Sequence, residues 1–354
     1  MKENSKKEKL LFGFRNLGLL IVSILLSLIG AELVSRALGI MPWTIEKPDI
    51  IVQPDGRLYR NHATLGYTQL SGEFKITLFD DYAFNVTHLE NGLRITQALL
   101  TYNDEHPRDE IWIFGCSFTY GWCLNDEETY PWLLQKRLPS HKIVNFSANG
   151  YGTVHSLIQF KEALKERDHP AAIILTYAWF HDVRNTYLRS RKKGLAYSKR
   201  HPLSQPYARF DSKGKLNYSM SAAQFREFPL MRYSAFLHLF EAAYHRFESR
   251  YYRSHDVSKA IIKDFQGICQ KREIPFVVAG IMSDPVTLNM LDYTKTQDIM
   301  TVDISVDLNR EGYRNLPYDA HPSATANIGF AQKLEFFLRN TILHRLTHKV
   351  LTNA

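Results

Sequence analysis

The chain has 354 residues, of which 45% are hydrophobic, 13% aromatic and 23% charged, and this composition indicates a folded protein with one large domain or two smaller ones. Its formal net charge is +8, but the basic residues gather at the amino end, in a middle segment and in the tail. Because no zinc-finger spacing or aromatic RNA-binding box accompanies them, we expect no nucleic-acid partner. The chain has three cysteines, too few for a disulfide scaffold. Cys116 and Cys123 could pair in an oxidising compartment, but we expect both to pack as small apolar residues.

The amino end has the pattern of a membrane anchor. A basic segment, 1–15, precedes an uncharged run rich in Leu and Ile from Asn16 to Ala31. With the residues that follow, the run approaches the roughly 20 residues that a spanning helix needs, so we predict a transmembrane signal anchor over 16–38. Basic residues before a span stay in the cytoplasm. The rest of the chain is therefore expected on the periplasmic or extracytoplasmic side of the inner (cell) membrane.

A cleaved signal peptide has the same charged and apolar regions and would also export the domain. We favour an uncleaved anchor, because Ile29-Gly-Ala31 is only a fair cleavage site and no lipobox cysteine follows. After the anchor, residues 39–108 contain short alternating runs separated by Pro, Gly, Asp and Asn. Runs such as Phe74–Phe79 and Tyr82–Thr87 predict a β-rich lead-in.

From residue 109 to residue 340 apolar strands alternate with helical stretches. The expected strands are 111–114, 142–146, 171–178, 275–281 and 300–306, and the expected helices are 129–138, 153–167, 256–271 and 324–338. This alternation predicts an α/β fold with a parallel sheet between two helical layers. A basic and aromatic segment, about 186–255, interrupts it. We interpret that segment as a solvated insertion with a helix from Tyr233 packed on the core, or else as a cap that favours anionic glycan or lipid headgroups. A basic tail, 341–354, ends the chain.

The stretch from Ile111 to Gly121 is an apolar strand that leads into a serine bracketed by glycines. A serine hydroxyl needs a nearby base, and backbone N–H groups must receive the oxyanion. The end of a buried parallel strand offers such a place, so Ser117 is the candidate nucleophile. The alternative is that Gly-x-Ser-x-x-x-Gly forms only a turn.

Three polar loops follow the first three strands. Ser117 follows the first strand, Asn145–Gly152 the second, and His181–Asn185 the third. Parallel sheets bind ligands beyond the carboxyl ends of their strands, so we expect these loops to form one site.

The last polar cluster is Tyr318-Asp319-Ala-His321-Pro-Ser323, just before the helix that begins at Ala324. Asp319 can accept the Nδ1 proton of His321 and leave Nε2 free to take the proton of Ser117. The alternative is an Asp/Ser turn and helix cap that happens to contain a histidine.

Together, the segments Gly115–Gly121, Asn145–Gly152 and Asp319–Pro322 resemble the sequence blocks of the SGNH, or GDSL-like, hydrolase superfamily, in particular its membrane-anchored bacterial members. The upstream Asn91–Arg94 looks like the lead-in strand of those members. The resemblance implies a three-layer αβα fold with a flavodoxin-like sheet. It also implies that Ser117 is the nucleophile, His321 the base and Asp319 its acid, with the N–H groups of Ser117 and Gly150 in the oxyanion hole.

Three positions depart from the family pattern. Cys116 replaces the usual acid before the serine, and His181 stands where an asparagine usually donates to the oxyanion. One residue instead of two separates Asp319 from His321, and Tyr318 holds the more usual acid position. A histidine can still donate a hydrogen bond, so His181 is a candidate third donor.

These residues predict a membrane-anchored, exported serine hydrolase that cleaves an ester, such as an acyl group on an envelope glycan or lipid. One alternative is an O-acyltransferase that uses the same triad on a cell-envelope polysaccharide. Another is a non-catalytic protein of the same fold that binds glycans. No cofactor is implied, and no metal site is expected, because the pair His181-Asp182 has no further ligands at metal-binding spacing.

Overall fold

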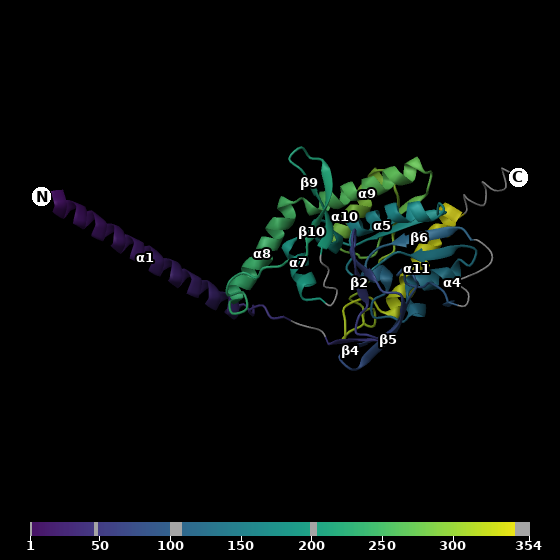
Figure 1. Ribbon diagram of the computed structural model, residues 1–354, viewed down its shortest axis with the longest axis horizontal. Coiled ribbons are helices and arrows are strands. Elements are labelled where there is room, and N and C mark those ends of the chain that lie inside the picture. The colour runs from purple at the N-terminus through teal and green to yellow at the C-terminus, as the bar shows by residue number, and fades with distance from the viewer. Residues whose placement is uncertain (1, 46–48, 100–107, 199–203, 344–354) are drawn as a thin grey trace. The chain divides into compact units, whose positions relative to one another are not determined.

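The computed structural model describes residues 2–45, 49–99, 108–198 and 204–343 (Figure 1). The chain forms two compact units, one of residues 1–46 with 225–248 and one of residues 47–224 with 249–354. Residues 344–354, which include most of the predicted basic tail, lie outside the described residues, as do Lys199 and Arg200 of the basic insertion.

The first unit contains the long amino-terminal helix α1 (Lys2–Ala37) and most of α8 (Ala235–Tyr251). Within α1, the stretch Phe12–Ala37 is long and apolar enough to cross a membrane. This observation rests on length and composition, and a signal sequence has the same two properties.

The second unit is built on a five-stranded sheet of β6 (Glu110–Phe114), β7 (Lys142–Asn145), β8 (Ala172–Tyr177), β11 (Phe276–Gly280) and β12 (Met300–Asp303). The strand order is β12-β11-β8-β6-β7, and every neighbouring pair is parallel. Counted along the chain, this is the order 2-1-3-4-5 of flavodoxin-like sheets, whose switch point lies between the first and third strands. The predicted fold class is confirmed.

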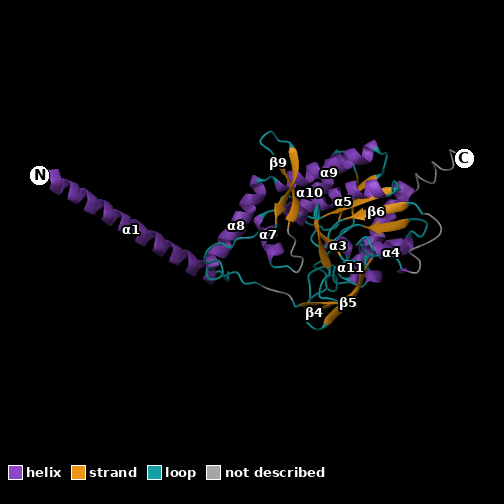
Figure 2. Ribbon diagram, viewed as in Figure 1, coloured by secondary structure: helices purple, strands orange, loops and turns teal. Residues whose placement is uncertain are grey.

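Helices cover both faces of this sheet, as Figure 2 shows. One face packs on α4 (Tyr130–Arg137) and α11 (Ala324–Leu338), and the other on α5 (Thr153–Glu166), α9 (Ser254–Lys271) and α10 (Pro285–Thr296). Alternation along β6 explains the two cores, because Trp112 belongs to one hydrophobic cluster and Ile113 to the other. Each such side chain contributes about 1.5–3 kcal/mol when fully buried. The sequence did not predict α10.

The lead-in is β-structured, as expected. Strands β1 (Ile50–Gln53), β4 (Gly72–Leu78) and β5 (Tyr82–His88) form an antiparallel sheet, and β2 (Tyr59–His62) pairs with β3 (Gly66–Gln69). The apolar residues of the three-stranded sheet share one core with Tyr120 and Cys123, which follow the candidate nucleophile. The lead-in therefore supports the loop that carries Ser117.

The interrupting segment is more ordered than a solvated insertion. It follows α6 (Phe180–Asn185) and contains α7 (Arg189–Ala196) and a hairpin of β9 (Ser204–Phe210) and β10 (Leu216–Ala222). Leu195 and Ala208 are buried, and β9 packs against α5 and α9. The interpretation as a solvated stretch was wrong for these residues, because turns and a short hairpin give weak sequence patterns. The remaining short elements are α3 (Ser117–Tyr120), η1 (Asp126–Glu128) and η2 (Arg339–Leu343).

Candidate active site

Ser117, His321 and Asp319 form a continuous hydrogen-bonded chain. Nε2 of His321 lies 2.8 Å from Oγ of Ser117, and Nδ1 lies 2.5 Å from Oδ1 of Asp319. The same Oδ1 accepts the backbone N–H of His321 at 2.8 Å. A carboxylate beside Nδ1 favours the tautomer that carries its proton there. Nε2 can then accept the hydroxyl proton of Ser117.

Asp319 is held as a carboxylate. Although burial raises the pKa of Asp319, the hydrogen bonds from His321 outweigh this effect and keep the pKa below its ordinary value. Its second oxygen, Oδ2, accepts the indole N–H of Trp122 at 3.3 Å. Both oxygens of the acid are thus occupied, and the group can orient an imidazole and stabilise its positive charge.

The nucleophile lies at a tight strand-to-helix junction. Ser117 is the first residue of α3, directly after β6, and Gly121 ends the turn in the left-handed region with φ of 86°. A Cβ on Gly115 would lie only 2.1 Å from Oγ1 of Thr176 and 2.4 Å from Oγ1 of Thr119, so only glycine fits there. Because the first N–H groups of a helix lack intrahelical partners, the N–H of Ser117 is available to an oxyanion.

Arg94 supports the strand-to-helix junction that carries Ser117. Its side chain is buried, and its Nε donates to Asp126 at 2.8 Å. Its two terminal nitrogens donate to the carbonyls of Gly121 at 2.6 Å and Leu124 at 2.7 Å. The lead-in thus supplies a cation whose planar fork organises the backbone that follows Ser117.

The second loop places Gly150 after β7. Gly150 has φ of 77°, which favours glycine, and its carbonyl accepts a hydrogen bond from Arg191 at 2.7 Å. The preceding carbonyl, of Asn149, accepts one from Tyr67 at 2.5 Å. Two side chains from distant parts of the sequence therefore fix this turn, and Arg191 is buried here instead of solvated.

The third loop carries His181 at the start of α6. The ring is fully buried, and its Nδ1 lies 3.2 Å from Oγ1 of Thr153. Nε2 is buried and has no hydrogen-bond partner among the described residues. Burial lowers the pKa of His181 well below its ordinary value, and the nearby Arg184 lowers it further, so the ring is neutral.

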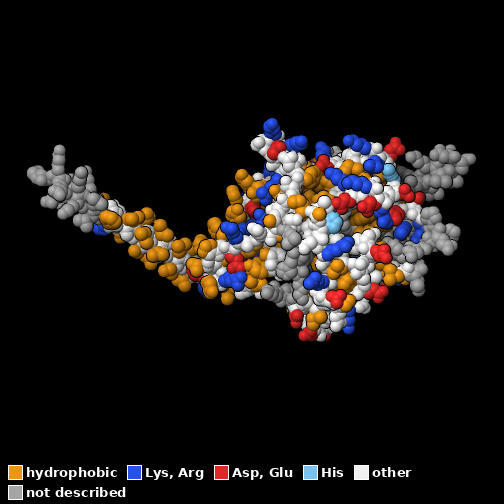
Figure 3. All heavy atoms as spheres, viewed as in Figure 1, with side chains coloured by type: hydrophobic (Ala, Val, Ile, Leu, Met, Phe, Trp, Pro, Cys, Tyr) orange, Lys and Arg blue, Asp and Glu red, His pale blue; other side chains and the backbone are white. Residues whose placement is uncertain are grey.

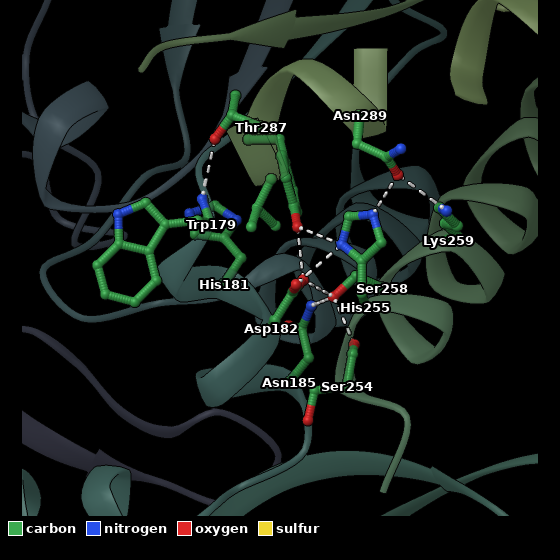
Figure 4. Close-up of polar contacts among 12 residues, drawn as sticks. Trp179, His181, Asp182, Asn185, Ser254, His255, Ser258, Lys259, Thr287 and Asn289 are labelled. Atoms are coloured by element: carbon green, nitrogen blue, oxygen red, sulfur yellow. Dashed lines mark hydrogen bonds and ion pairs between the residues drawn. The ribbon is translucent and has the colours of Figure 1, made fainter. Parts of the chain in front are cut away.

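Next to His181, Asp182 anchors the third loop (Figure 4). Its carboxylate accepts hydrogen bonds from Ser258 at 2.6 Å and Tyr177 at 2.5 Å, and Oδ2 lies 2.9 Å from Nδ1 of His255. Ser258 and His255 belong to α9, so this network ties α6 to α9. Asp182 thus supports the third loop through its contacts with Tyr177 and α9.

The structure brings Ser117, His321 and Asp319 together, and it places Gly150 and His181 on the loops after the two strands that flank β6. Among the described residues, no hydrogen bond joins Gly150 or His181 to Ser117. The sequence did not predict the roles of Trp122 and Arg94, although Asn91–Arg94 resembles the lead-in strand of the family. Among the described residues, no group of three or more His, Cys, Asp or Glu side chains could hold a metal ion. Cys116, Cys123 and Cys269 are free and buried.

No protein-family model and no curated protein matches the chain. Similar solved structures include a member of the lipolytic protein G-D-S-L family from Veillonella parvula, with 11% identity and a TM-score of 0.37 over 65% of this chain and 98% of that one. A psychrotrophic esterase from Pseudoalteromonas has 12% identity and a TM-score of 0.38 over 66% of this chain and 97% of its own.

An extracellular lipase from Streptomyces rimosus has 11% identity and a TM-score of 0.36 over 66% of this chain and 99% of its own. All three are distant similarities of fold. They include the family that the sequence blocks resemble, but the function proposed below rests on the residues of this chain.

Proposed function

We propose that this protein is a membrane-anchored serine esterase of the SGNH type. The observation that supports the proposal best is the Ser117–His321–Asp319 chain at the carboxyl end of β6, next to the switch point of the sheet. The base lies within hydrogen-bond reach of both the nucleophile and the orienting acid, as acyl transfer through a covalent intermediate requires.

In the proposed reaction, Oγ of Ser117 attacks the acyl carbonyl carbon while Nε2 of His321 takes the hydroxyl proton. The tetrahedral intermediate collapses, the ester C–O bond breaks, and His321 returns the proton to the leaving alcohol. Water then attacks the acyl-enzyme with His321 again as base, which releases the acid and restores Ser117. Asp319 remains ionised throughout and stabilises the transient imidazolium.

The oxyanion requires donors aimed at the developing charge. The N–H of Ser117 at the start of α3 and the N–H of Gly150 are the two backbone candidates. His181 is the third candidate, because its ring is neutral and its Nε2 has no partner among the described residues. Each such donor typically contributes about 10²–10³ in kcat.

The expected substrate is an acylated envelope glycan or lipid, because helix α1 would anchor the protein. The apolar stretch Phe12–Ala37 follows a basic segment, an arrangement that keeps the amino end in the cytoplasm and the catalytic unit on the other side. A tethered enzyme samples substrates at the membrane or in the adjacent envelope.

A fluorophosphonate probe tests the esterase proposal, because it reacts with activated serines only. We expect the full-length protein in detergent to label stoichiometrically, and Ser117→Ala to lose all labelling. Ser140→Ala, at an exposed serine away from the site, should label like the parent. Absence of labelling in a folded parent protein would overturn the proposal, as would labelling that survives in Ser117→Ala.

A further inference from the structure

The amino end of helix α8 forms hydrogen bonds with Glu32, a residue of helix α1. Oε2 of Glu32 in α1 accepts hydrogen bonds from the hydroxyl of Ser234 at 2.7 Å and the N–H of Phe236 at 3.0 Å, and Oε1 accepts from the N–H of Ala235 at 3.0 Å. A carboxylate at a helix amino end satisfies unpaired N–H groups and interacts favourably with the helix dipole. The start of α8 is thus fixed to the last turns of the candidate span.

A second set of contacts strengthens this junction. Arg36 pairs with Glu32 at 2.6 Å and donates to the carbonyl of Tyr233 at 2.9 Å. Nδ1 of His238 lies 2.8 Å from the carbonyl of Met41, just beyond α1. The segment before α8 and its first turn therefore lie where the chain leaves the span.

The outward face of α8 is apolar. Phe236, Phe240, Tyr244 and Phe247 recur every three or four residues, which at about 100° per residue places them on one stripe. Phe240 is 49% exposed and Phe247 is 62% exposed. Such a stripe normally faces a protein core.

Acidic side chains of α8 are buried and aromatic side chains are exposed, which is the reverse of the pattern of a helix in water. The acidic side chains Glu241 and Glu248 are only 6% and 7% exposed, while the aromatic residues beside them are open. Acidic residues are seldom buried and large aromatic residues seldom gather on a solvated face. This inversion is expected when the environment outside the helix is apolar.

The exposed stripe continues toward the candidate span. Leu230 and Tyr233 precede α8 and are 68% and 76% exposed, and Leu38 and Met41 after the span are 71% and 65% exposed. Figure 3 shows hydrophobic side chains along α1 and over α8. Exposed Arg226 and Arg246 accompany this surface and suit anionic headgroups.

We propose that residues 228–247 form an interfacial segment, in which the aromatic stripe of α8 enters the headgroup and acyl boundary of the outer leaflet. This inference rests on the proposed anchoring by α1 and adds a second membrane contact to it. Aromatic residues opposite polar ones are typical of helices that lie in the membrane surface. The occupant of this apolar stripe is lipid.

Nitroxide labels can test this contact in the full-length protein. The native cysteines are buried and free, so the variants Phe240→Cys and Phe247→Cys offer a single reactive thiol each. Ala242→Cys is the matched control, because residue 242 is exposed and lies about 200° around the helix from residue 240. Each protein is reconstituted in phosphatidylcholine vesicles with and without phosphatidylglycerol.

The label's collision rates with oxygen, which concentrates in lipid, and with a water-soluble nickel chelate are then compared. We expect a several-fold higher oxygen-to-nickel ratio at 240 and 247 than at 242. Equal, water-like ratios in protein that floats with the vesicles would overturn the interfacial contact and leave the anchor intact. Exclusion of both reagents with spin–spin broadening would indicate a second copy instead of lipid, and failure to float would overturn anchor and contact together.

Discussion

Trp122 donates its indole N–H to Oδ2 of Asp319 over 3.3 Å, and it does so from the loop that Ser117 begins. The acid of the candidate triad is therefore held by the nucleophile's own loop as well as by His321. The Trp122 ring meets Phe84 of β5 edge-on at 5.3 Å, so the lead-in fixes the indole in turn. A positioning role for Trp122 follows from these contacts.

Trp122→Phe should lower kcat about tenfold while it keeps most of the packing on Phe84. Hydrogen bonds to charged groups contribute about 1.5–3 kcal/mol when buried, and the partial exposure of Asp319 reduces this value. The Trp122 N–H also lowers the pKa of Asp319. Its loss should raise that pKa and make the carboxylate a stronger acceptor for the Nδ1 proton of His321, so the acid limb of the pH profile of kcat/KM should move to higher pH.

Tyr82→Phe is the matched control for Trp122→Phe. The hydroxyl of Tyr82 donates to the carbonyl of Cys123 at 2.6 Å, so it supports the same loop without a bond to Asp319. We expect its acid limb to stay in place. An equal shift in both variants would show that Trp122 acts only through loop stability.

Much of the site could be predicted from the polar residues that directly follow the predicted strands. Ser117 comes directly after an apolar strand, and the short spacing of Asp319 and His321 before a helix predicts an acid beside a base. The boundaries of α11, Ala324–Leu338, agree with the expected helix residue for residue. Local patterns carry these features because they depend on residues close in sequence.

Other parts of the site depend on contacts between distant residues. Arg94 reaches Asp126, and Arg191 reaches Gly150, yet each arginine alone predicts a solvated side chain. Trp122 approaches Asp319 only after the lead-in and the sheet have packed together. Contacts between residues so far apart leave no periodic pattern in a single sequence, so these positioning residues could not be predicted.

Asp319→Asn should lower kcat by about 10⁴, because an amide favours the wrong tautomer of the histidine. The rate of fluorophosphonate labelling should fall with it, while the folded fraction stays unchanged. Asp81→Asn is the control, since Asp81 accepts a hydrogen bond from Tyr318 at 2.5 Å on the exposed side of the same loop. Unchanged labelling in Asp319→Asn would remove Asp319 from the triad.

Arg94→Met should destabilise the catalytic unit by about 3–5 kcal/mol, because Asp126 would lose the partner of a buried ion pair. The two side chains are 0% and 9% exposed. The double variant with Asp126→Asn should lose less than the sum of the single variants. Lys295→Met breaks an exposed pair with Asp292 and should cost under about 1 kcal/mol. Denaturant unfolding in detergent measures all four, and a small loss for Arg94→Met would contradict this role.

His255 should make stability depend on pH. Burial lowers the pKa of His255, but Asp182 more than offsets this, and the net pKa is raised. The folded pKa then exceeds the unfolded value of about 6.5, so the stabilisation is fully present below that pH and is lost as pH rises through the folded pKa. The thermal midpoints of parent and His255→Gln should differ most on the acidic side. His141→Gln should show the opposite trend, because burial lowers the pKa of His141. On the acidic side the parent should lose stability relative to this variant.

The role of His181 can be resolved by a series of substitutions at two positions. If Nε2 donates to the oxyanion, His181→Ala should lower kcat by about 10²–10³ with little change in KM, because the contact forms mainly in the transition state. His181→Asn should recover part of the loss, since an amide can donate from a similar place. In that case the Thr153 hydroxyl, which lies 3.2 Å from Nδ1, donates to Nδ1, and Thr153→Val should give an intermediate loss. Full kcat per labelled active site in His181→Ala, with only a lower thermal midpoint, would assign His181 to packing and leave the N–H groups of Ser117 and Gly150 as the donors.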